Sequence, residues 1–536
     1  MHMSDDFPLL LSTLYDRSVR AFPGQAISSV EADGSVYRAT YRETDVRTRK
    51  LATAFDALDL DRDAVIGSFG WNTHRHHELY WATANTGRVL HTLNIRLFAD
   101  QLIYVVNHAE DKAVFVDVDL LPLIEPHADK MPTVEHWIVM GGSPADSSLE
   151  GAISYEDLIA AQAPLEAWPE VDERSPMMLC YTSGTTGHPK GVAYTQRSTY
   201  LHTMANLSTT QMSPDDNLLA IVSMFHAAAW GLAYVAVVAG AKITYPGHDM
   251  SAEGLVRRFR DEEVTFSAGV PTVFIGMQQY LIEHPDLGLP SIRRLLCGGS
   301  AVPRGLMKWF LEAQDIEMGQ AWGMTELNPV ASVALITAEM KEWPLDKQLD
   351  VMETVGIAMP GLQMKIVDDE GIRLPEDGIA FGELLIRGPW VAAEYYRDDR
   401  SEFTFQDGWM RTGDVCTINE LGYVKITDRA KDVIKSGGEW ISSLDLENTL
   451  MGHPDVAEAV VVGLAHPKWD ERPMAFVVPR SGASPHAGDL LEWLAPQVAK
   501  WWLPDELRFI DEIPKTGTGK FDKKVLRAEF ADEYMA

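Results

Sequence analysis

Cysteines, basic residues and long hydrophobic stretches are all scarce in this sequence. The three cysteines, Cys180, Cys297 and Cys416, never form a CxxC pair, so neither a disulfide framework nor a zinc site is expected. The longest apolar run, residues 230–241, is far shorter than the roughly 20 residues that cross a bilayer. The first residues have neither the basic nor the apolar region of a signal peptide. We therefore expect a cytoplasmic protein without stable membrane insertion.

Acidic residues greatly outnumber basic ones, 78 against 46, which gives a formal net charge of −32. So negative a chain is not expected to bind nucleic acid or an anionic membrane. The same background makes a local basic cluster informative. Between residues 515 and 527 there is one acid, Asp522, among five cations: Lys515, Lys520, Lys523, Lys524 and Arg527. We expect an anionic small molecule to bind there, although Lys523 and Lys524 also suit the solvated start of a helix.

The chain is too long for one hydrophobic core, because domains usually stop growing at about 250–300 residues. Its composition, 46% apolar and 23% charged, is typical of a folded protein. Apolar runs alternate with helical patterns over the first 430 residues, which predicts an α/β fold with parallel sheets covered by helices. The expected strands are residues 64–67, 113–116, 136–139, 177–180, 218–222, 243–245 and 264–266.

The character of the sequence changes near residue 430, at the charged stretch 427–432. Beyond this stretch we expect a helix at residues 445–451 and strands at 456–462 and 506–513. About a hundred residues are enough for a small α+β domain. We therefore predict a large domain at residues 1–430 and a small one at 431–536.

A glycine-rich loop after the expected strand 177–180 is the strongest local signal. It reads Thr182-Ser183-Gly184-Thr185-Thr186-Gly187-His188-Pro189-Lys190-Gly191. Its glycines let backbone amides approach a ligand, its hydroxyls can donate to phosphate oxygens, and Lys190 adds a positive charge. These groups predict a phosphate-binding loop rather than a plain surface turn. It is not a Walker A loop, because glycine follows Lys190 where that motif has Ser or Thr.

This loop resembles the hallmark of the acyl-adenylate-forming enzymes, which comprise acyl-CoA ligases, peptide-synthetase adenylation domains and luciferases. Further motifs follow in the family's order, from about residue 8 to residue 527. The resemblance implies the adenylate-forming fold, in which domain 1–430 binds ATP and the acyl group and domain 431–536 is mobile and carries a catalytic lysine. It also implies ATP, Mg²⁺ and coenzyme A, together with a small-molecule carboxylic acid as substrate.

Most roles that the resemblance implies fall on the large domain. The residues implied to bind the nucleotide are Thr182, Ser183, Gly184, Thr185, Thr186, Lys190, Gly299, Ser300, Ala301, Trp322, Gly323, Asp414 and Arg429. Of these, Asp414 and Arg429 would hold the ribose. Thr325 would contact the α-phosphate, and Glu326 would bind Mg²⁺, a cation that prefers hard oxygen ligands.

Three features of the small domain complete the implied machinery. Lys431 occupies the family's hinge position between the two domains. The glycine turn Gly437-Gly438-Glu439 would help to form the tunnel for the pantetheine of coenzyme A. Lys520 matches the catalytic lysine, and Lys523 and Lys524 are candidates for contacts with coenzyme A phosphates.

The acyl pocket is implied at residues 223–231, which resemble the corresponding segment of medium- and long-chain fatty acyl-CoA ligases. His226 would lie near the carboxylate and the thiol path, with Gly299 and Gly323 also lining the pocket. Trp230, expected one helical turn after His226, is either a gate or a core aromatic residue. Because residues 225–230 are mainly apolar, we expect a linear, hydrophobic acid such as a fatty acid or 3-methylmercaptopropionate. The sequence departs from that subgroup at Ile95, where proline is usual, and at residues 195–196, where Ser-His is common.

Two other functions remain open at this point. One is an acyl-AMP ligase that loads a separate carrier protein, and the other is a nucleotide-binding sensor without turnover. A homodimer is a further expectation, because homodimers are common among such enzymes. The stretch His74-Arg75-His76-His77-Glu78 invites interpretation as a metal site but lacks HExxH spacing, so we expect it on a helix face without a metal.

Overall fold

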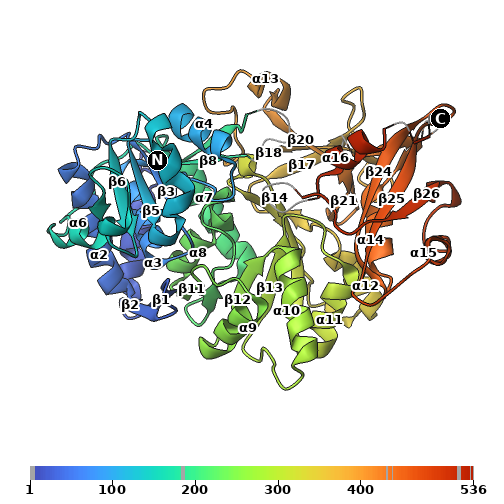
Figure 1. Ribbon diagram of the computed structural model, residues 1–536, viewed down its shortest axis with the longest axis horizontal. Helices are drawn as coiled ribbons and strands as arrows, with labels where there is room; N and C mark the ends of the chain where they lie inside the picture. The colour runs from blue at the N-terminus through green and yellow to red at the C-terminus, as the bar shows by residue number, and fades with distance from the viewer. Residues whose placement is uncertain are drawn as a thin grey trace, which may run out of the picture.

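Four β-sheets organise the chain, and the computed structural model of the protein describes residues 6–182, 188–429, 432–436, 439–515, 521–531 and 533–534. For residues 439 and 440 it describes the backbone only. Two large sheets lie in the N-terminal part, a smaller one follows them, and the fourth belongs to the C-terminal part (Figure 1).

The first large sheet has seven strands and is parallel except for its last pair. Its strands, in spatial order, are β7 (Ile153–Ser154), β6 (His136–Met140), β5 (Ala113–Asp117), β3 (Val65–Phe69), β4 (Val89–Thr92), β8 (Pro176–Tyr181) and β9 (Gly191–Thr195). The antiparallel pair β8 and β9 flanks the glycine-rich loop, which therefore lies at the carboxyl end of a buried strand.

The second large sheet has nine strands and is parallel through its middle. Its strands, in spatial order, are β16 (Ile357–Ala358), β15 (Val330–Val333), β14 (Glu317–Gly323), β13 (Arg294–Gly298), β12 (Phe266–Gly269), β10 (Asn217–Leu219), β11 (Lys242–Tyr245), β1 (Ala26–Val30) and β2 (Val36–Thr40). The predicted parallel sheets covered by helices are thus confirmed.

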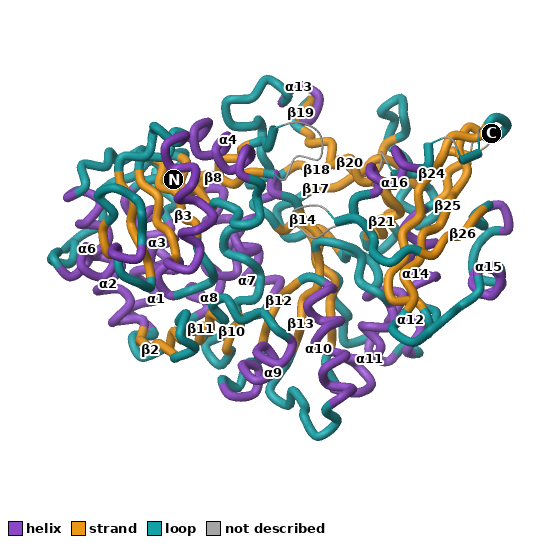
Figure 2. Tube along the Cα trace, in the orientation of Figure 1, coloured by secondary structure: helices purple, strands orange, loops and turns teal. Residues whose placement is uncertain are grey.

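Helices fill the space between the two large sheets and cover their outer faces (Figure 2). The helices of the N-terminal part are α1 (Leu11–Ala21), α2 (Tyr41–Ala57), α3 (His74–Thr86), α4 (Ala99–Ala109), α5 (Leu121–Ile124), α6 (Tyr155–Ala160), α7 (Gln196–Thr210), α8 (Leu232–Ala239), α9 (Ala252–Asp261), α10 (Pro271–Glu283), α11 (Arg304–Gln314), α12 (Leu345–Met352) and α13 (Ser401–Thr404). Helices α3 and α7 each contact strands of both sheets. One hydrophobic core therefore joins the two sheets into a single body.

Local sequence explains where the central helices begin and how deeply they lie. Thr40 and Glu43 form a capping box at the start of α2, and Thr195 and Ser198 form another at the start of α7. Helix α8 is fully buried, because its residues are apolar on every face. Among the described residues, no helix combines the length and the apolarity needed to cross a membrane.

The third sheet was not anticipated from the sequence. It is antiparallel and consists of β17 (Gln363–Val367), β18 (Phe381–Arg387), β20 (Trp409–Ile418), β19 (Phe405–Gln406) and β21 (Val424–Arg429). Its strands follow one another without intervening long helices, so the α/β alternation seen earlier in the chain does not extend to it. The sheet supplies Asp414 and Arg429.

The fourth sheet begins where the chain leaves the third. Strand β21 ends at Arg429, and the next strand belongs to a sheet of β23 (Glu439–Ile441), β22 (Ile434–Ser436), β25 (Asp470–Pro479), β24 (Val456–His466) and β26 (Glu506–Phe509). The change of sheet brackets the predicted boundary at residues 430 and 431, which lie outside the described residues.

Alternating side chains of β24 pack into two hydrophobic cores, one on each face of the fourth sheet. Val461 packs with α14 (Ser443–Met451) and α15 (Ala487–Leu494), whereas Val460 and Val462 pack with α16 (Lys523–Glu529). The expected helix 445–451 and strand 456–462 are both present. Other expected strands differ in length: β10 and β26 end early, at Leu219 and Phe509, and β12 begins only at Phe266.

Candidate active site

The glycine-rich loop is closed at its base by backbone contacts. The Thr182 amide donates to the Lys190 carbonyl at 2.9 Å, and the Lys190 amide donates to Thr182 Oγ1 at 3.3 Å. Both residues thus lie at fixed positions beside β8 and β9. Ser183, Gly184, Thr185 and Thr186 lie outside the described residues, so their predicted contacts with phosphate stay predictions.

Lys190 faces Tyr395, which belongs to none of the sequence motifs. Its ammonium nitrogen lies 4.2 Å from the centroid of the Tyr395 ring, an arrangement in which the electron-rich face of the ring attracts the cation. Burial lowers the pKa of Lys190, and the positive charge of Arg400 lowers it further. The lysine is therefore held against the ring of Tyr395.

Thr325 and Glu326 lie in a short 3-10 helix, Thr325–Leu327, just after β14. Both are buried, with exposed fractions of 7% and 6%. The Tyr194 hydroxyl donates to the Thr325 carbonyl at 2.7 Å, and the Tyr395 hydroxyl donates to Glu326 Oε1 at 2.8 Å. Tyr395 thereby connects Glu326, from the nine-stranded sheet, to Lys190, from the seven-stranded sheet.

The surroundings of Glu326 fit a magnesium ion better than a transition metal. Within the described part of the chain, no group of three or more His, Cys, Asp and Glu side chains could hold a metal ion. Mg²⁺ needs no such group, because it keeps several waters and uses one or two carboxylates together with substrate phosphates. Glu326 offers one hard carboxylate next to the expected phosphate site.

Asp414 and Arg429 lie opposite each other on neighbouring strands, β20 and β21. Arg429 Nε lies 2.8 Å from Asp414 Oδ1, and Trp322 Nε1 donates to Asp414 Oδ2 at 2.9 Å. The carboxylate is almost fully buried, with 2% of the residue exposed. The structure therefore brings Trp322 to Asp414, 92 positions further along the chain, and it holds Asp414 in a defined orientation.

Glycines 298, 299 and 323 are required by backbone geometry as well as by any ligand. A side chain at Gly298 would approach the Ala321 carbonyl oxygen to 2.2 Å, and one at Gly323 would approach the Pro329 carbonyl oxygen to 1.9 Å. Gly299 has a φ of +85°, which glycine adopts without strain. Space for a flat base is thus only part of the reason for these glycines.

The Trp230 side chain lies against this glycine turn. Its Cη2 atom would be 3.2 Å from a Cβ at Gly298, and the residue is half-buried. The expectation that a helical turn separates His226 from Trp230 was wrong: residues 227–230 all have positive φ, from 38° to 56°. This left-handed turn is costly for residues other than glycine, and it aims the indole at the turn after β13. Asn206 helps to hold it by donating to the Trp230 carbonyl at 3.0 Å.

Several predicted residues of the small domain lie outside the described residues. These are Lys431, Gly437, Gly438 and Lys520. Glu439 begins β23 and pairs with Ser436 of β22, although its side chain is not described. The stretch that carries Lys520 starts and ends at Lys515 and Phe521, which pair with each other across it.

Three of the described cations in the basic cluster at residues 515–527 are paired with acids, and Lys520 lies outside the described residues. Lys523 Nζ lies 2.6 Å from Glu447 Oε1, and its side chain is only 13% exposed. Lys523 is the first residue of α16, as expected for the start of a helix, but its side chain lies in an ion pair rather than in solvent. Contacts of Lys523 and Lys524 with coenzyme A stay predictions. Lys515 and Arg527 are paired as well, with Glu458 and Asp432.

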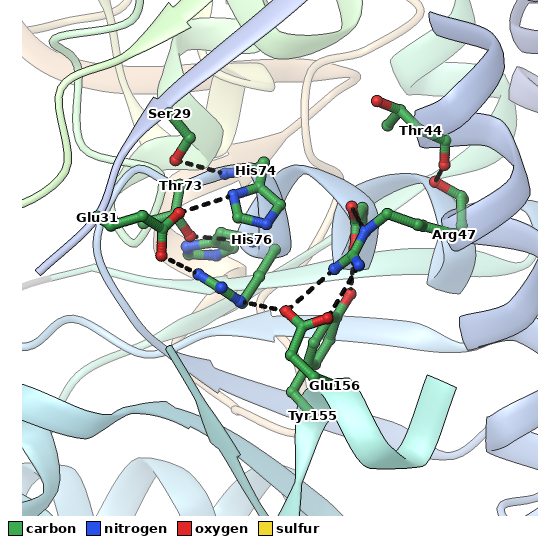
Figure 3. Close-up of polar contacts among 12 residues, drawn as sticks. Ser29, Glu31, Thr44, Arg47, Thr73, His74, His76, Tyr155 and Glu156 are labelled. Carbon is green, nitrogen blue, oxygen red and sulfur yellow. Dashed lines mark hydrogen bonds and ion pairs between the residues drawn. The ribbon is translucent and has the colours of Figure 1, made fainter. Parts of the chain in front are cut away.

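The histidine-rich stretch at residues 74–78 starts α3, as predicted, and its side chains are engaged in a buried polar network (Figure 3). His74 Nδ1 lies 3.3 Å from Glu31 Oε1, and His76 Nε2 lies 2.9 Å from Ser68 Oγ. Arg75 pairs with both Glu31 and Glu156, at 2.7 and 2.8 Å. This network links the end of β1 to α3 and α6, so the histidine-rich stretch has a structural role.

Comparison with known proteins identifies the family that the sequence motifs resemble, over most of the chain. The family model described as AMP-binding enzyme matches residues 15–396, and the model described as AMP-binding enzyme C-terminal domain matches residues 445–520. The chain is 40% identical over 529 residues to a 3-methylmercaptopropionyl-CoA ligase of Ruegeria lacuscaerulensis, covering 98% of each protein.

Two further relatives are named as fatty-acid–CoA ligases. A medium-chain-fatty-acid–CoA ligase of Ectopseudomonas oleovorans is 40% identical, with 98% of this chain and 96% of the relative covered. A long-chain-fatty-acid–CoA ligase of Thermus thermophilus is 41% identical, with 99% and 97% covered. Among solved structures, an anthranilate CoA ligase in complex with anthranoyl-AMP superposes with a TM-score of 0.87 over the full length of both chains, at 22% identity. That likeness extends to the fold.

Proposed function

The chain belongs to the AMP-binding enzyme family, and from this premise we propose that it is an AMP-forming acid–CoA ligase that activates a linear, mainly hydrophobic carboxylic acid. The observation that carries the proposal is the meeting of three motif groups around one site. Lys190 and Glu326 meet at Tyr395, and Asp414 meets Arg429 and Trp322.

In the first half-reaction the substrate carboxylate attacks the α-phosphorus of ATP, and pyrophosphate leaves. Asp414 accepts hydrogen bonds from the ribose hydroxyls, and Arg429 donates to ribose and phosphate oxygens. Lys190 attracts the phosphates electrostatically. Thr325 and Lys520 stabilise the charge that develops on the α-phosphate. When bound at Glu326, Mg²⁺ supplies positive charge to the phosphates. Catalysis here consists of positioning and electrostatic stabilisation.

In the second half-reaction the thiol of coenzyme A attacks the acyl-adenylate, and AMP leaves. We propose that domain 431–536 rotates about Lys431 between the two steps. The rotation withdraws Lys520 and brings the turn Gly437-Gly438 to the site. Such alternation needs a few residues that absorb a large change of backbone angles. The fourth sheet joins the third through the short segment after Arg429, which is compatible with this motion.

The lysine assignment is tested with Lys520→Ala. We expect acyl-AMP formation, measured as pyrophosphate release, to fall at least about a hundredfold, because stabilisation of the transition-state charge is lost. Thioester formation from supplied acyl-AMP should stay near the wild-type rate. Lys468→Ala, a change at an exposed turn, serves as control for loss of positive charge on the small domain. Equal losses in both half-reactions would remove the proposed role of Lys520.

The preference for a linear hydrophobic acid rests on the apolar segment 225–230 and on the acids in the names of the relatives. A panel of straight-chain, thioether and aryl acids, followed by AMP release with and without coenzyme A, tests it. Release of AMP only with a carrier protein would favour the carrier-loading ligase. An absence of AMP release with every acid would favour a sensor without turnover.

A further inference from the structure

Tyr395 contacts two groups of the ATP site that come from different sheets. Its ring lies under the Lys190 ammonium at 4.2 Å, and its hydroxyl donates to Glu326 Oε1 at 2.8 Å. Tyr395 and Glu326 are each only 6% exposed. One side chain therefore fixes both the cation of the glycine-rich loop and the carboxylate expected to hold Mg²⁺.

The hydroxyl contact determines how Glu326 is presented. Because Oε1 accepts a hydrogen bond from the Tyr395 hydroxyl, rotation of the carboxylate is restricted, and Oε2 is the oxygen that Tyr395 does not contact. Hydrogen bonds to an ionised group are stronger and more directional than neutral ones.

The tyrosine is itself held firmly, so it can act as a reference point. Its backbone amide donates to Ser401 Oγ at 2.8 Å, and its ring packs edge-on against Phe405. The segment around it is bonded to both halves of the site. The Ala392 amide donates to the Glu326 carbonyl, and the Tyr396 amide donates to the Gly191 carbonyl, each at 2.8 Å.

We propose that Tyr395 is a positioning residue that orients Glu326 for Mg²⁺ and keeps Lys190 aligned with it before ATP binds. The inference rests on the proposed function, because it assigns Glu326 and Lys190 to the same Mg–ATP complex. It predicts that the two parts of the side chain have separable effects. The hydroxyl governs the dependence on Mg²⁺, whereas the ring governs the affinity of the loop for the nucleotide.

Two substitutions separate these effects. Tyr395→Phe removes the hydroxyl and keeps the ring, and Tyr395→Leu removes both. The readout is equilibrium binding of ATP over a range of Mg²⁺ concentrations, without acid or coenzyme A, so that no turnover takes place. For Tyr395→Phe we expect the Mg²⁺ midpoint to rise about tenfold, as for the loss of one hydrogen bond to a charged group. For Tyr395→Leu we expect a similar rise and, at saturating Mg²⁺, ATP binding weakened about threefold further.

The neighbouring tyrosine provides a matched control. The Tyr396 ring packs edge-on against His108, and the Arg397 guanidinium lies over the same ring. Because these contacts do not involve Glu326, Tyr396→Phe should leave the Mg²⁺ midpoint unchanged. In a Glu326→Gln background, Tyr395→Phe should change the midpoint little, because the two residues act as one unit. A lowered thermal midpoint of Tyr395→Phe with an unchanged Mg²⁺ midpoint would mean a structural role only and would overturn the inference.

The experiment also separates the inference from its premise. If the wild-type protein binds Mg–ATP and Tyr395→Phe binds it with the same Mg²⁺ dependence, the inference fails and the ligase proposal stands. If the wild-type protein does not bind Mg–ATP at all, both fail together.

Discussion

At the scale of single residues, some of the described candidate site groups are held by several neighbours. Asp414 illustrates this: an indole nitrogen and a guanidinium approach its two carboxylate oxygens from different strands. A carboxylate oriented in this way can accept two hydrogen bonds from vicinal hydroxyls without first losing rotational freedom. Its contribution should therefore appear in nucleotide binding.

Asp414→Ala tests this expectation. The change removes the acceptor for the ribose and leaves Arg429 and Trp322 without their shared partner. We expect the KM for ATP to rise about 10- to 100-fold, in line with the loss of hydrogen bonds to a charged group, while kcat falls less. Steady-state kinetics with varied ATP measures both. Glu420→Ala, at an exposed acid nearby in the sequence, should leave the KM for ATP within about twofold of wild type.

At the scale of secondary structure, a buried ionic cluster fastens α16 to α14 and to β21. Lys523 Nζ lies 2.6 Å from Glu447 Oε1 on α14, and it donates to Ser443 Oγ at 2.6 Å. Ser443 in turn donates to Asp428 on β21 at 2.6 Å. The cluster thus joins three elements, one of which belongs to the third sheet.

Lys523→Met should be strongly destabilising, since it leaves two buried carboxylates without their cation. We expect a loss of about 3–5 kcal/mol in the free energy of unfolding of the small domain at pH 7–8. Thermal unfolding of the full chain, followed by hydrogen exchange in α14 and α16, measures it. Lys524→Met, at the exposed neighbouring lysine, should cost less than about 0.5 kcal/mol.

The penalty of Lys523→Met should also depend on pH. Burial raises the pKa of Glu447 from 4.5 to about 6, even with Lys523 beside it. A carboxyl whose pKa is raised by folding destabilises the folded state when it ionises, so the cost grows as pH rises from 4.5 through 6. Without Lys523 this cost should be larger, and the difference between variant and wild type should shrink toward pH 5. A difference that is constant between pH 5 and pH 8 would contradict this explanation.

Element by element, the sequence predicted which segments form strands and helices better than it predicted which distant residues contact each other. The strand that ends in the glycine-rich loop was expected, because an apolar run followed by glycines indicates a buried strand with a turn at its carboxyl end. The role of Tyr395 was not expected. Its immediate sequence, residues 394–398, contains no hydroxyl-and-glycine pattern, and its two contacts lie 69 and 205 positions away in the chain.

At the scale of the whole molecule, the arrangement of sheets explains how motifs far apart in sequence form one site. The loop after β8 belongs to the seven-stranded sheet, the Thr325–Leu327 turn to the nine-stranded sheet, and Asp414 to the third (Figure 1). The shared core of the two large sheets makes them one body, whereas the fourth sheet has cores of its own. This division is what a rotation of the small domain requires.

The hinge proposal is tested with Lys431→Pro. Proline fixes φ and removes a backbone donor, so it should prevent the change of backbone angles that separates the two half-reactions. We expect acyl-AMP formation to stay near wild type and thioester formation from acyl-AMP to fall at least about tenfold. Lys431→Ala, which keeps the backbone free, should support both steps. Normal thioester turnover in Lys431→Pro would remove the hinge.

By itself, the sequence determined the class of fold, the order of the motifs and the chemistry of their side chains, because periodicity, glycine turns and charged groups are written locally along the chain. Only the tertiary structure decided which of these groups meet. It brought Lys190 and Glu326 to Tyr395, paired Asp414 with Arg429 and Trp322, and buried Lys523 against Glu447 instead of leaving it open to an anion. The physical reason is that a contact between distant residues depends on how sheets pack, and packing is a property of the whole core.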